Sequence, residues 1–370
     1  MNGIAGDIII TTIVVFLFIF SYNPVAHSMD SQKEITIYDI AKKVKLSAST
    51  VSRALQDHPA INKKTKKKIF DVAEQMGYRS NLFARNLRQQ RTMTIGVMVQ
   101  ELNSAFMTSL LSGVEKVANE AGYGVVIIDS LDDVEKEAAN ARNLFNRRID
   151  GVITWLSSGA KNLDHFNVFV DKSIPVVLID SLHQQSGITS VGIDNRACGH
   201  MAAKHLIEQG CRRIAHITSN LKTPVNALRY KGFRDALAEN KIAFNERMVV
   251  VAPVTEEDSI EAAKKIMQMK PLPDGVFINN DFTAAVCIRT FLENKVKVPQ
   301  DIAVVGFNND PIGTFIRPSL TTINYPGKEM GAAAARTLIN QLNGVGTIEQ
   351  ASNLTLRTEL VVRQSSVKKR

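Results

Sequence analysis

The chain has 370 residues, enough for two or three domains, and its 45% hydrophobic and 22% charged content is typical of a soluble protein. Its three cysteines form no CxxC pair and its histidines lack metal-ligand spacing, which argues against a disulfide framework and a zinc site. The net charge is +9, and residues 30–92 hold 14 Lys and Arg against 6 Asp and Glu, so nearly all of the basic excess lies in one short segment.

The first apolar run, Ile8–Phe20, is thirteen residues long, whereas a membrane-spanning helix needs about 20. Its length suits the core of a signal peptide, and Ala26-His27-Ser28 could serve as a cleavage site. However, the residues before it include Asp7 and no Lys or Arg, whereas secretory signals begin with positive charge. We interpret residues 1–28 as upstream sequence included by an early start codon, with translation beginning at Met29; a membrane anchor is the alternative.

Residues Thr36–Leu55 predict two short helices joined by a tight turn. Thr36 can cap the first helix with Asp39 as its capping-box partner, and Ser47 can cap the second. Apolar spacing turns Val51, Ala54 and Leu55 inward and leaves small or hydrogen-bonding side chains outward, at Ala48, Ser49, Ser52 and Arg53. Such a unit fits the DNA major groove, where these side chains contact base edges and phosphates. An ordinary helical hairpin with a solvated face is the alternative.

A third predicted helix carries a run of lysines opposite a buried stripe that contains Ile69 and Ala73, and it ends at Gly77. The lysines are Lys63, Lys64, Lys66, Lys67 and Lys68. A lysine run alone is commonly a solvated face. Beside a helix-turn-helix it favours contact with phosphates, which gives salt-sensitive affinity without sequence choice.

From Thr94 onward, short apolar runs alternate with stretches of helical spacing. The predicted strands are Thr94–Val99, Gly124–Ile128, Gly151–Trp155, Pro175–Ile179, Arg213–Ile217, Gly275–Ile278 and Ile302–Phe307. Repeated βα units imply parallel sheets with helices on both faces. Because the strands are too many for one comfortable sheet, we expect an α/β fold with two doubly wound lobes.

Polar residues stand where these strands end, at Asp129, Asp180, Asp194, Asp281 and Asn308. Ligands of open α/β sheets bind at the carboxyl ends of the strands. With Arg229, these groups suit hydrogen bonds to sugar hydroxyls, and Phe106, Trp155 and Phe307 could supply apolar faces for a ring. Taken singly, each acid is commonly a helix cap or a turn residue. The chain has no GxSxG, Walker or HExxH motif, so we expect no enzyme, catalytic residue, metal or cofactor.

Several runs stand in one order along essentially the whole chain from Ile35 onward. They are TIYDIAKKVKLSASTVSRAL (36–55), NLFARNLR (81–88), TIGVMV (94–99), HLIEQGCRRIAHI (205–217), ALRYKGF (227–233), NND (279–281), VVGFNND (304–310), RPSLTTI (317–323) and TELVVRQSS (358–366). Each run alone is a weak signal. Together they resemble the lactose/galactose repressor family of bacterial transcription regulators.

The resemblance implies a helix-turn-helix headpiece at residues 34–79, a hinge helix or linker at 80–92, and an effector-binding and dimerisation domain at 93–370. The last of these would have two lobes like those of periplasmic sugar-binding proteins. The resemblance places the first lobe at about 93–188 and 325–348, and the second at about 189–324 and 349–366.

In this family the hinge folds when two copies pack together on DNA, and a leucine wedges into the minor groove; Leu87 stands at that position. A plain linker is the alternative. The predicted DNA contacts are Thr36, Tyr38, Ala48, Ser49, Thr50, Ser52, Arg53, Asn81, Ala84 and Leu87. The predicted effector contacts are Phe106, Asp129, Trp155, Asp180, Arg229, Asp281, Phe307 and Asn308. By resemblance Arg229, Asp281 and Asn308 are the stronger candidates, although family members usually carry Asp at the position of Asn308.

The residues and the resemblance predict a cytoplasmic, homodimeric transcription regulator, a repressor whose affinity for an approximately palindromic operator is set by a small molecule between the lobes. We expect that molecule to be a sugar, and we expect no stable membrane association. The rival hypothesis is an exported or membrane-anchored sugar-binding receptor. The basic helix-turn-helix segment counts against it, because export would separate that segment from DNA.

Overall fold

The computed structural model describes residues 35–55, 57–78, 91–181, 188–345 and 353–368. The chain divides into two units, Met1–Leu82 and Phe83–Arg370, here called the headpiece and the body. The predicted hinge positions Asn81, Ala84 and Leu87 and the N-terminal residues 1–28 lie outside the described residues. No helix within the described ranges is both long and apolar enough to cross a membrane.

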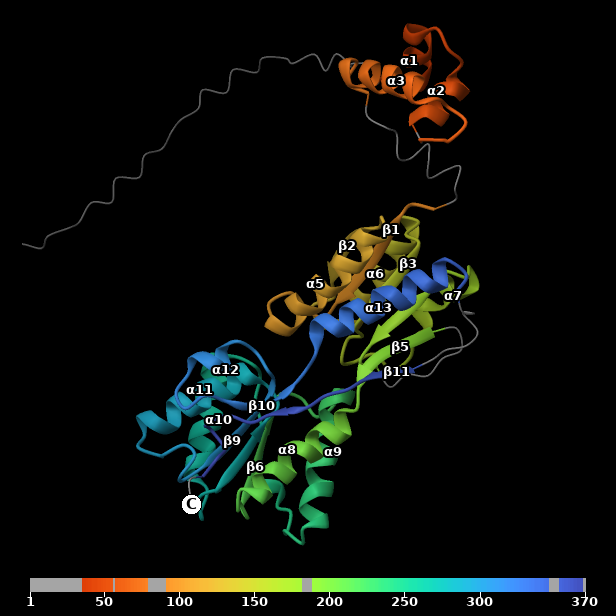
Figure 1. Cartoon of the computed structure of the whole chain (residues 1–370). Coiled ribbons are helices and arrows are strands. Elements are labelled where there is room, and N and C mark those ends of the chain that lie inside the picture. Colours follow the sequence, from red (N-terminus) through yellow and green to blue (C-terminus); the bar gives the residue numbers. More distant parts are fainter. Residues whose placement is uncertain (1–34, 56, 79–90, 182–187, 346–352, 369–370) are drawn as a thin grey trace, which may run out of the picture. The chain divides into compact units, whose positions relative to one another are not determined.

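The headpiece contains the predicted helix-turn-helix and a third helix. These are α1 (Ile37–Val44), α2 (Ala48–Leu55) and α3 (Lys63–Gln75) (Figure 1). The capping box of α1 is present, with the Thr36 backbone N–H donating to the Asp39 carboxylate at 2.9 Å. Ser47 Oγ accepts from the Thr50 N–H at 3.1 Å and so caps α2. These local bonds satisfy helix N–H groups that would otherwise have no acceptor.

One small core joins the three headpiece helices. Its fully buried members include Ile40 from α1, Val51 and Ala54 from α2, and Ile69 from α3. These are the positions that helical spacing predicts to face inward. Their burial fixes which face of α2 remains outside.

The first lobe of the body is built on a six-stranded parallel sheet in the order β11-β5-β4-β3-β1-β2. Its strands are β1 (Thr94–Val99), β2 (Gly124–Asp129), β3 (Gly151–Thr154), β4 (Val176–Ile179), β5 (Ile188–Ile193) and β11 (Asn353–Leu356). Its helices are α5 (Ala105–Glu120), α6 (Val134–Asn146), η1 (Asp164–Phe166), α7 (Asn167–Asp171) and α13 (Gly327–Leu342). Ile95 and Val97 pack toward α5 and α13, whereas Met98 packs toward α6, η1 and α7. Helices therefore cover both faces, as the uninterrupted apolar strands predict.

The second lobe has a six-stranded sheet in the order β12-β10-β9-β8-β6-β7, parallel except for the antiparallel pair β10 and β12. Its strands are β6 (Ile214–Thr218), β7 (Val249–Val251), β8 (Gly275–Ile278), β9 (Ala303–Asn308), β10 (Thr321–Asn324) and β12 (Leu360–Val361). Its helices are α8 (Asn195–Glu208), α9 (Pro224–Glu239), η2 (Glu246–Met248), α10 (Glu256–Gln268), α11 (Asp281–Glu293) and α12 (Ile312–Phe315). The two-lobed α/β architecture agrees with the prediction.

The chain passes between the lobes three times, and the lobe boundaries differ from those expected at two places. Strand β5 pairs with β4 in the first sheet, so the first crossing follows Ile193, although the second lobe is expected from about residue 189. Strand β11 pairs with β5, so the third crossing lies between Leu356 and Leu360, although the second lobe is expected to resume at about 349. Strand β11 is a short edge strand and β5 lies inside the sheet next to it, but neither has a local pattern that says which of two sheets it joins.

Each lobe contains a pair of helices that approach closely at glycine. A Cβ atom on Gly113 of α5 would lie 2.0 Å from the backbone oxygen of Lys328 in α13. A Cβ atom on Gly199 of α8 would likewise lie 1.9 Å from the backbone oxygen of Arg229 in α9. In Figure 1, α13 lies along α5 and α9 along α8. Only glycine permits these backbones to come so close, because any side chain would displace the partner helix.

We expect Gly113→Ala to lower the free energy of unfolding by at least about 1 kcal/mol, since the new methyl group must push α13 away. Urea titration followed by Trp155 emission measures this, because Trp155 is the only tryptophan and lies in the same lobe. Gly124→Ala is the control, because its Cβ would meet only the Met93 backbone oxygen at 3.8 Å. Equal destabilisation by both substitutions would contradict the close-packing argument.

Candidate functional site

The predicted outward face of α2 is exposed in the headpiece. Ser49 and Arg53 are exposed, and Ala48, Thr50 and Ser52 are partly buried. Tyr38 on α1 has 71% of its surface exposed, and Thr36 is exposed at the cap of the same helix. The Ser47 hydroxyl lies 2.9 Å from that of Ser49 and 2.8 Å from that of Thr50, so polar groups gather at the N-terminus of α2. The geometry suits insertion of this helix end into a groove.

The lysines of α3 differ in their surroundings. Lys63, Lys64, Lys67 and Lys68 are exposed, but the Lys66 ammonium lies 2.5 Å from the Asp57 carboxylate and also donates to the Asp57 carbonyl oxygen at 2.9 Å. This pairing lowers the pKa of Asp57. Lys66 therefore fastens the turn before α3, whereas the other four lysines remain available to an anionic partner.

In the body, aromatic rings from both lobes meet around Tyr325, at the second crossing. The Phe106 ring stacks on the Tyr325 ring with centroids 3.9 Å apart, and the Trp155 ring stands edge-on to Phe106 at 5.3 Å. The Phe307 ring lies 5.4 Å from Tyr325 on the side of the second lobe. Three predicted effector residues are thus brought together by a fourth aromatic residue that sequence reasoning missed.

Asp180 is the centre of a buried polar network beside these rings. Its carboxylate accepts from Asn195 Nδ2 at 2.9 Å, from the Ile193 backbone N–H at 3.2 Å and from the Tyr325 hydroxyl at 2.5 Å. Burial beside this carboxylate raises the pKa of Tyr325 well above its usual value. All these donors lie on the two segments that pass between the lobes, so Asp180 holds those segments together.

Arg229 extends from α9 to the Phe307 and Tyr325 rings and is only 5% exposed. Its Nε donates to Asn195 Oδ1 at 2.8 Å, and its guanidinium carbon lies 3.5 Å from the centre of the Phe307 ring. Among the residues that the structure describes, nothing accepts from its Nη1 or Nη2. These two amino groups are not among the buried unpaired atoms of the described residues, so water or a ligand can reach them, while the guanidinium plane stacks on Phe307.

The remaining predicted effector residues are more strongly committed to the protein itself. Asp281 is fully buried and accepts from Thr322 Oγ1 at 2.7 Å and from the Asp310 N–H at 2.8 Å; burial raises its pKa to about 7. Asn308 donates to the Asp310 carboxylate at 3.2 Å. Asp129, at the end of β2, lies 2.5 Å from the Lys136 ammonium. The structure therefore gathers Phe106, Trp155, Asp180, Arg229 and Phe307 around Tyr325, whereas Asp281 and Asn308 both bond to Asp310 and Asp129 pairs with Lys136.

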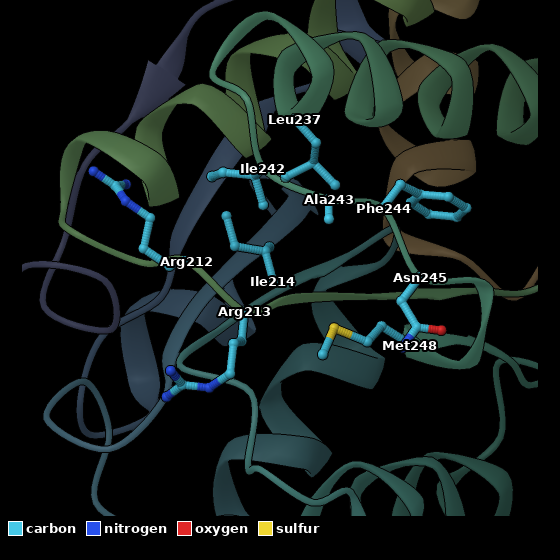
Figure 2. A pocket seen from close by; sticks show the side chains of 9 residues that line it. All are labelled: Arg212, Arg213, Ile214, Leu237, Ile242, Ala243, Phe244, Asn245 and Met248. Atoms are coloured by element: carbon cyan, nitrogen blue, oxygen red, sulfur yellow. The ribbon is translucent and has the colours of Figure 1, made fainter.

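A hollow of about 480 Å³ lies elsewhere on the second lobe, at the amino end of β6. Figure 2 shows Ile214, Leu237 and Ile242 together at its centre, whereas the guanidinium groups of Arg212 and Arg213 point away from them. Arg212 donates to the backbone oxygens of Ile207 and Cys211, which accounts for its direction. Without converging polar groups this hollow lacks the features of a specific small-molecule site.

Comparison with known proteins agrees with this division of the chain. Residues 36–81 match the model of bacterial regulatory proteins of the lacI family, and residues 203–366 match the periplasmic binding protein-like domain. Catabolite control protein A of Priestia megaterium is 31% identical over 310 residues, which are 84% of this chain and 93% of that protein. The chain belongs to the lacI family of bacterial regulatory proteins.

Other lacI-family matches extend over nearly the whole chain. The ribose operon repressor of Halalkalibacterium halodurans is 30% identical over 335 residues, 90% of this chain and 97% of that protein. The structure of a CelR–cellobiose complex superposes with a TM-score of 0.67 at 25% identity, covering 90% of this chain and all of that one. These relatives are regulators, and none of the three is described as an enzyme.

We expect Tyr325→Phe to lower the free energy of unfolding by about 1–3 kcal/mol, because a buried carboxylate loses one of its donors. Chemical denaturation of the folded body measures the change. Tyr230→Phe is the matched control, since no described residue bonds to the half-buried Tyr230 hydroxyl. If the two substitutions cost the same, the Asp180 network would not be a special source of stability.

Proposed function

We propose that this lacI-family protein is a sequence-specific transcription repressor, active in the cytoplasm, whose operator affinity is set by a small molecule bound at Arg229. The observation that carries the proposal is Arg229, a nearly buried residue whose two solvent-accessible amino groups have no acceptor among the described residues and which stacks on Phe307 beside rings of the first lobe. Fixed donors beside apolar faces suit a polyhydroxylated ring, with hydroxyl oxygens accepting and ring carbons packing.

The names of related proteins support a sugar as the ligand class. One relative is called a ribose operon repressor, and the superposed CelR structure holds cellobiose. Asn308 and Asp310 lie near one another at the end of β9 and could add acceptors and donors on the side of the second lobe. A ligand contacting Phe106 and Trp155 of one lobe and Arg229 of the other would favour one lobe orientation, and only such a preference can shift an equilibrium.

We propose that the outward face of α2 recognises the operator and that the exposed lysines of α3 contact DNA phosphates. We propose a homodimer, which presents two headpieces to an approximately palindromic site. Exposed apolar side chains on the edge strands of both sheets support a second copy as the partner of the body. Ile127 is 46% exposed on β2, and Val251 is 52% exposed on β7. Large apolar groups on two edges are otherwise a liability.

We expect Arg53→Ala to weaken binding to the preferred duplex by about 1–3 kcal/mol and to relax choice at one position per half-site, if its guanidinium reads a base edge. Selection from a random duplex pool would first define that preferred sequence, and gel-shift titrations at two salt concentrations would follow. Lys67→Ala is the comparison, because an exposed lysine on phosphate should weaken all duplexes uniformly. The absence of any preferred duplex for the unmutated protein would instead favour the sugar-receptor alternative.

We expect Arg229→Met to remove the response to effector while the headpiece still binds DNA. A thermal-shift panel of cellobiose, ribose and free nucleobases identifies a compound that raises the melting temperature of the unmutated protein. Calorimetry with that compound should then show at least about tenfold weaker binding to the variant, because its acceptors lose a charged partner. Arg234→Met is the control, since Arg234 lies on the same helix but packs over Phe244, 4.7 Å from the ring centre. Unchanged affinity in Arg229→Met would refute the proposed site.

A further inference from the structure

One buried acid in the first lobe has no part in the proposed function. Glu137 lies on α6 in the same stripe as the buried Ala141 and Leu144, where helical spacing calls for an apolar side chain. It has no exposed surface. Burying a carboxylate is costly unless its oxygens are engaged, so the contacts of Glu137 show what it holds in place.

Both carboxylate oxygens of Glu137 are directed to the loop that follows β3. Oε2 accepts from the backbone N–H of Ser157 at 2.5 Å. Oε1 lies 2.8 Å from Nε2 of His165 in η1, a close polar contact without the geometry of a hydrogen bond. The N-terminal turns of α6 add a favourable field for the negative charge. Glu137 thus holds the loop near its start and at its end.

The same loop is fastened beside this contact by a second acid. The Asp132 carboxylate accepts from the backbone N–H and the hydroxyl of Ser158, both at 2.6 Å. Unlike Glu137, Asp132 is exposed, so water can replace its bonds. Glu137 therefore gives the loop a buried contact that water cannot replace, beside the buried bond between the Ser157 and Ser130 hydroxyls.

The loop begins with Trp155, two residues before Ser157. Trp155 comes directly after the last residue of β3, and its ring stands edge-on to Phe106 and to Tyr325. Its backbone N–H is bonded to the Met98 oxygen, so the strand fixes one side of this residue, and the Gln100 bond to the Leu156 oxygen together with the Ser157 contact fixes the other. A shift of Ser157 would therefore change the orientation of the Trp155 side chain relative to Phe106 and Tyr325.

We propose that Glu137 is a positioning residue for the effector site: from α6, through the Ser157 amide and His165, it sets the orientation of Trp155 against Phe106 and Tyr325. The inference rests on the proposed function, because it assigns to Trp155 a part of the effector surface. A buried charge in an apolar stripe defines one loop conformation, which an apolar residue could not do since it makes no directional bond.

Trp155 is the only tryptophan in the chain, so its emission reports on this loop without added label or ligand. The test compares acrylamide quenching of Trp155 with hydrogen exchange of the Ser157 amide in the full-length protein. In Glu137→Met, which keeps the volume but removes both acceptors, we expect the quenching constant to rise about twofold and Ser157 to exchange faster. Glu137→Gln should restore near-normal values, because it still offers an oxygen to the Ser157 N–H.

Glu135→Met is the matched control, since Glu135 is exposed on the same helix turn and should leave Trp155 unchanged. His165→Phe keeps an aromatic ring but removes the polar contact with Glu137 Oε1, and we expect a smaller rise in quenching. A quenching constant and Ser157 exchange rate equal to those of the unmutated protein, in folded Glu137→Met, would overturn the proposal. Should Glu137→Met not fold, an unchanged indole in His165→Phe would overturn it instead.

The effector measurement separates this inference from the proposed function. With the compound that stabilises the unmutated protein, Glu137→Met should bind more weakly while its affinity for the preferred duplex without effector is unchanged. If no compound stabilises the unmutated protein, or if its binding leaves Trp155 emission unaltered, the proposed effector site fails. The quenching and exchange results would still decide whether Glu137 positions Trp155.

Discussion

The buried carboxylate of Asp180 is the constraint on which the body depends. A carboxylate in that position must find donors, and it finds them on both of the first two segments that pass between the lobes: Ile193 and Asn195 on one, Tyr325 on the other. Gly192 is required beside it, because a Cβ atom there would lie 2.7 Å from an Asp180 oxygen. The two crossings are thereby held as one unit, and any change in lobe orientation must act through them.

Arg229 connects this hinge region to the second lobe. Its Nε bonds to Asn195, which itself bonds to Asp180, while its guanidinium covers Phe307. The helix that carries it packs tightly on α8 at Gly199, so the backbone of Arg229 cannot shift without moving α8 or breaking that contact. A ligand that binds its free donors would therefore act on the helix pair α8 and α9, and through Asn195 on the segments that pass between the lobes.

The sequence predicts those parts of the fold in which local pattern and burial agree. The apolar runs at β1, β3, β4 and β8 are predicted correctly because they are short and uninterrupted, as strands covered by helices on both faces are. Strand β5 and the edge strand β11 are misassigned because tertiary pairing, and not their own residues, decides which sheet they join. The predicted aromatic residues Phe106, Trp155 and Phe307 lie close together. Asp281, in contrast, is fully buried and bonded to Thr322. An acid at the end of a strand can be a ligand contact or a structural partner, and the sequence alone does not distinguish the two.

Tyr325 and Glu137 were missed for a common physical reason. Each acts through a partner that is distant in sequence, Asp180 for the tyrosine and Ser157 for the glutamate. Neither residue belongs to a recognisable sequence motif. The only available signal for Glu137 is a charge at an apolar position of a helix. Because such a charge must be matched by specific donors, it marks where the fold holds one conformation. The Asp180 carboxylate holds Tyr325, which stacks on Phe106, and the Glu137 carboxylate holds the loop that begins with Trp155. A ligand that distinguishes one lobe orientation from another would have to do so at these rings.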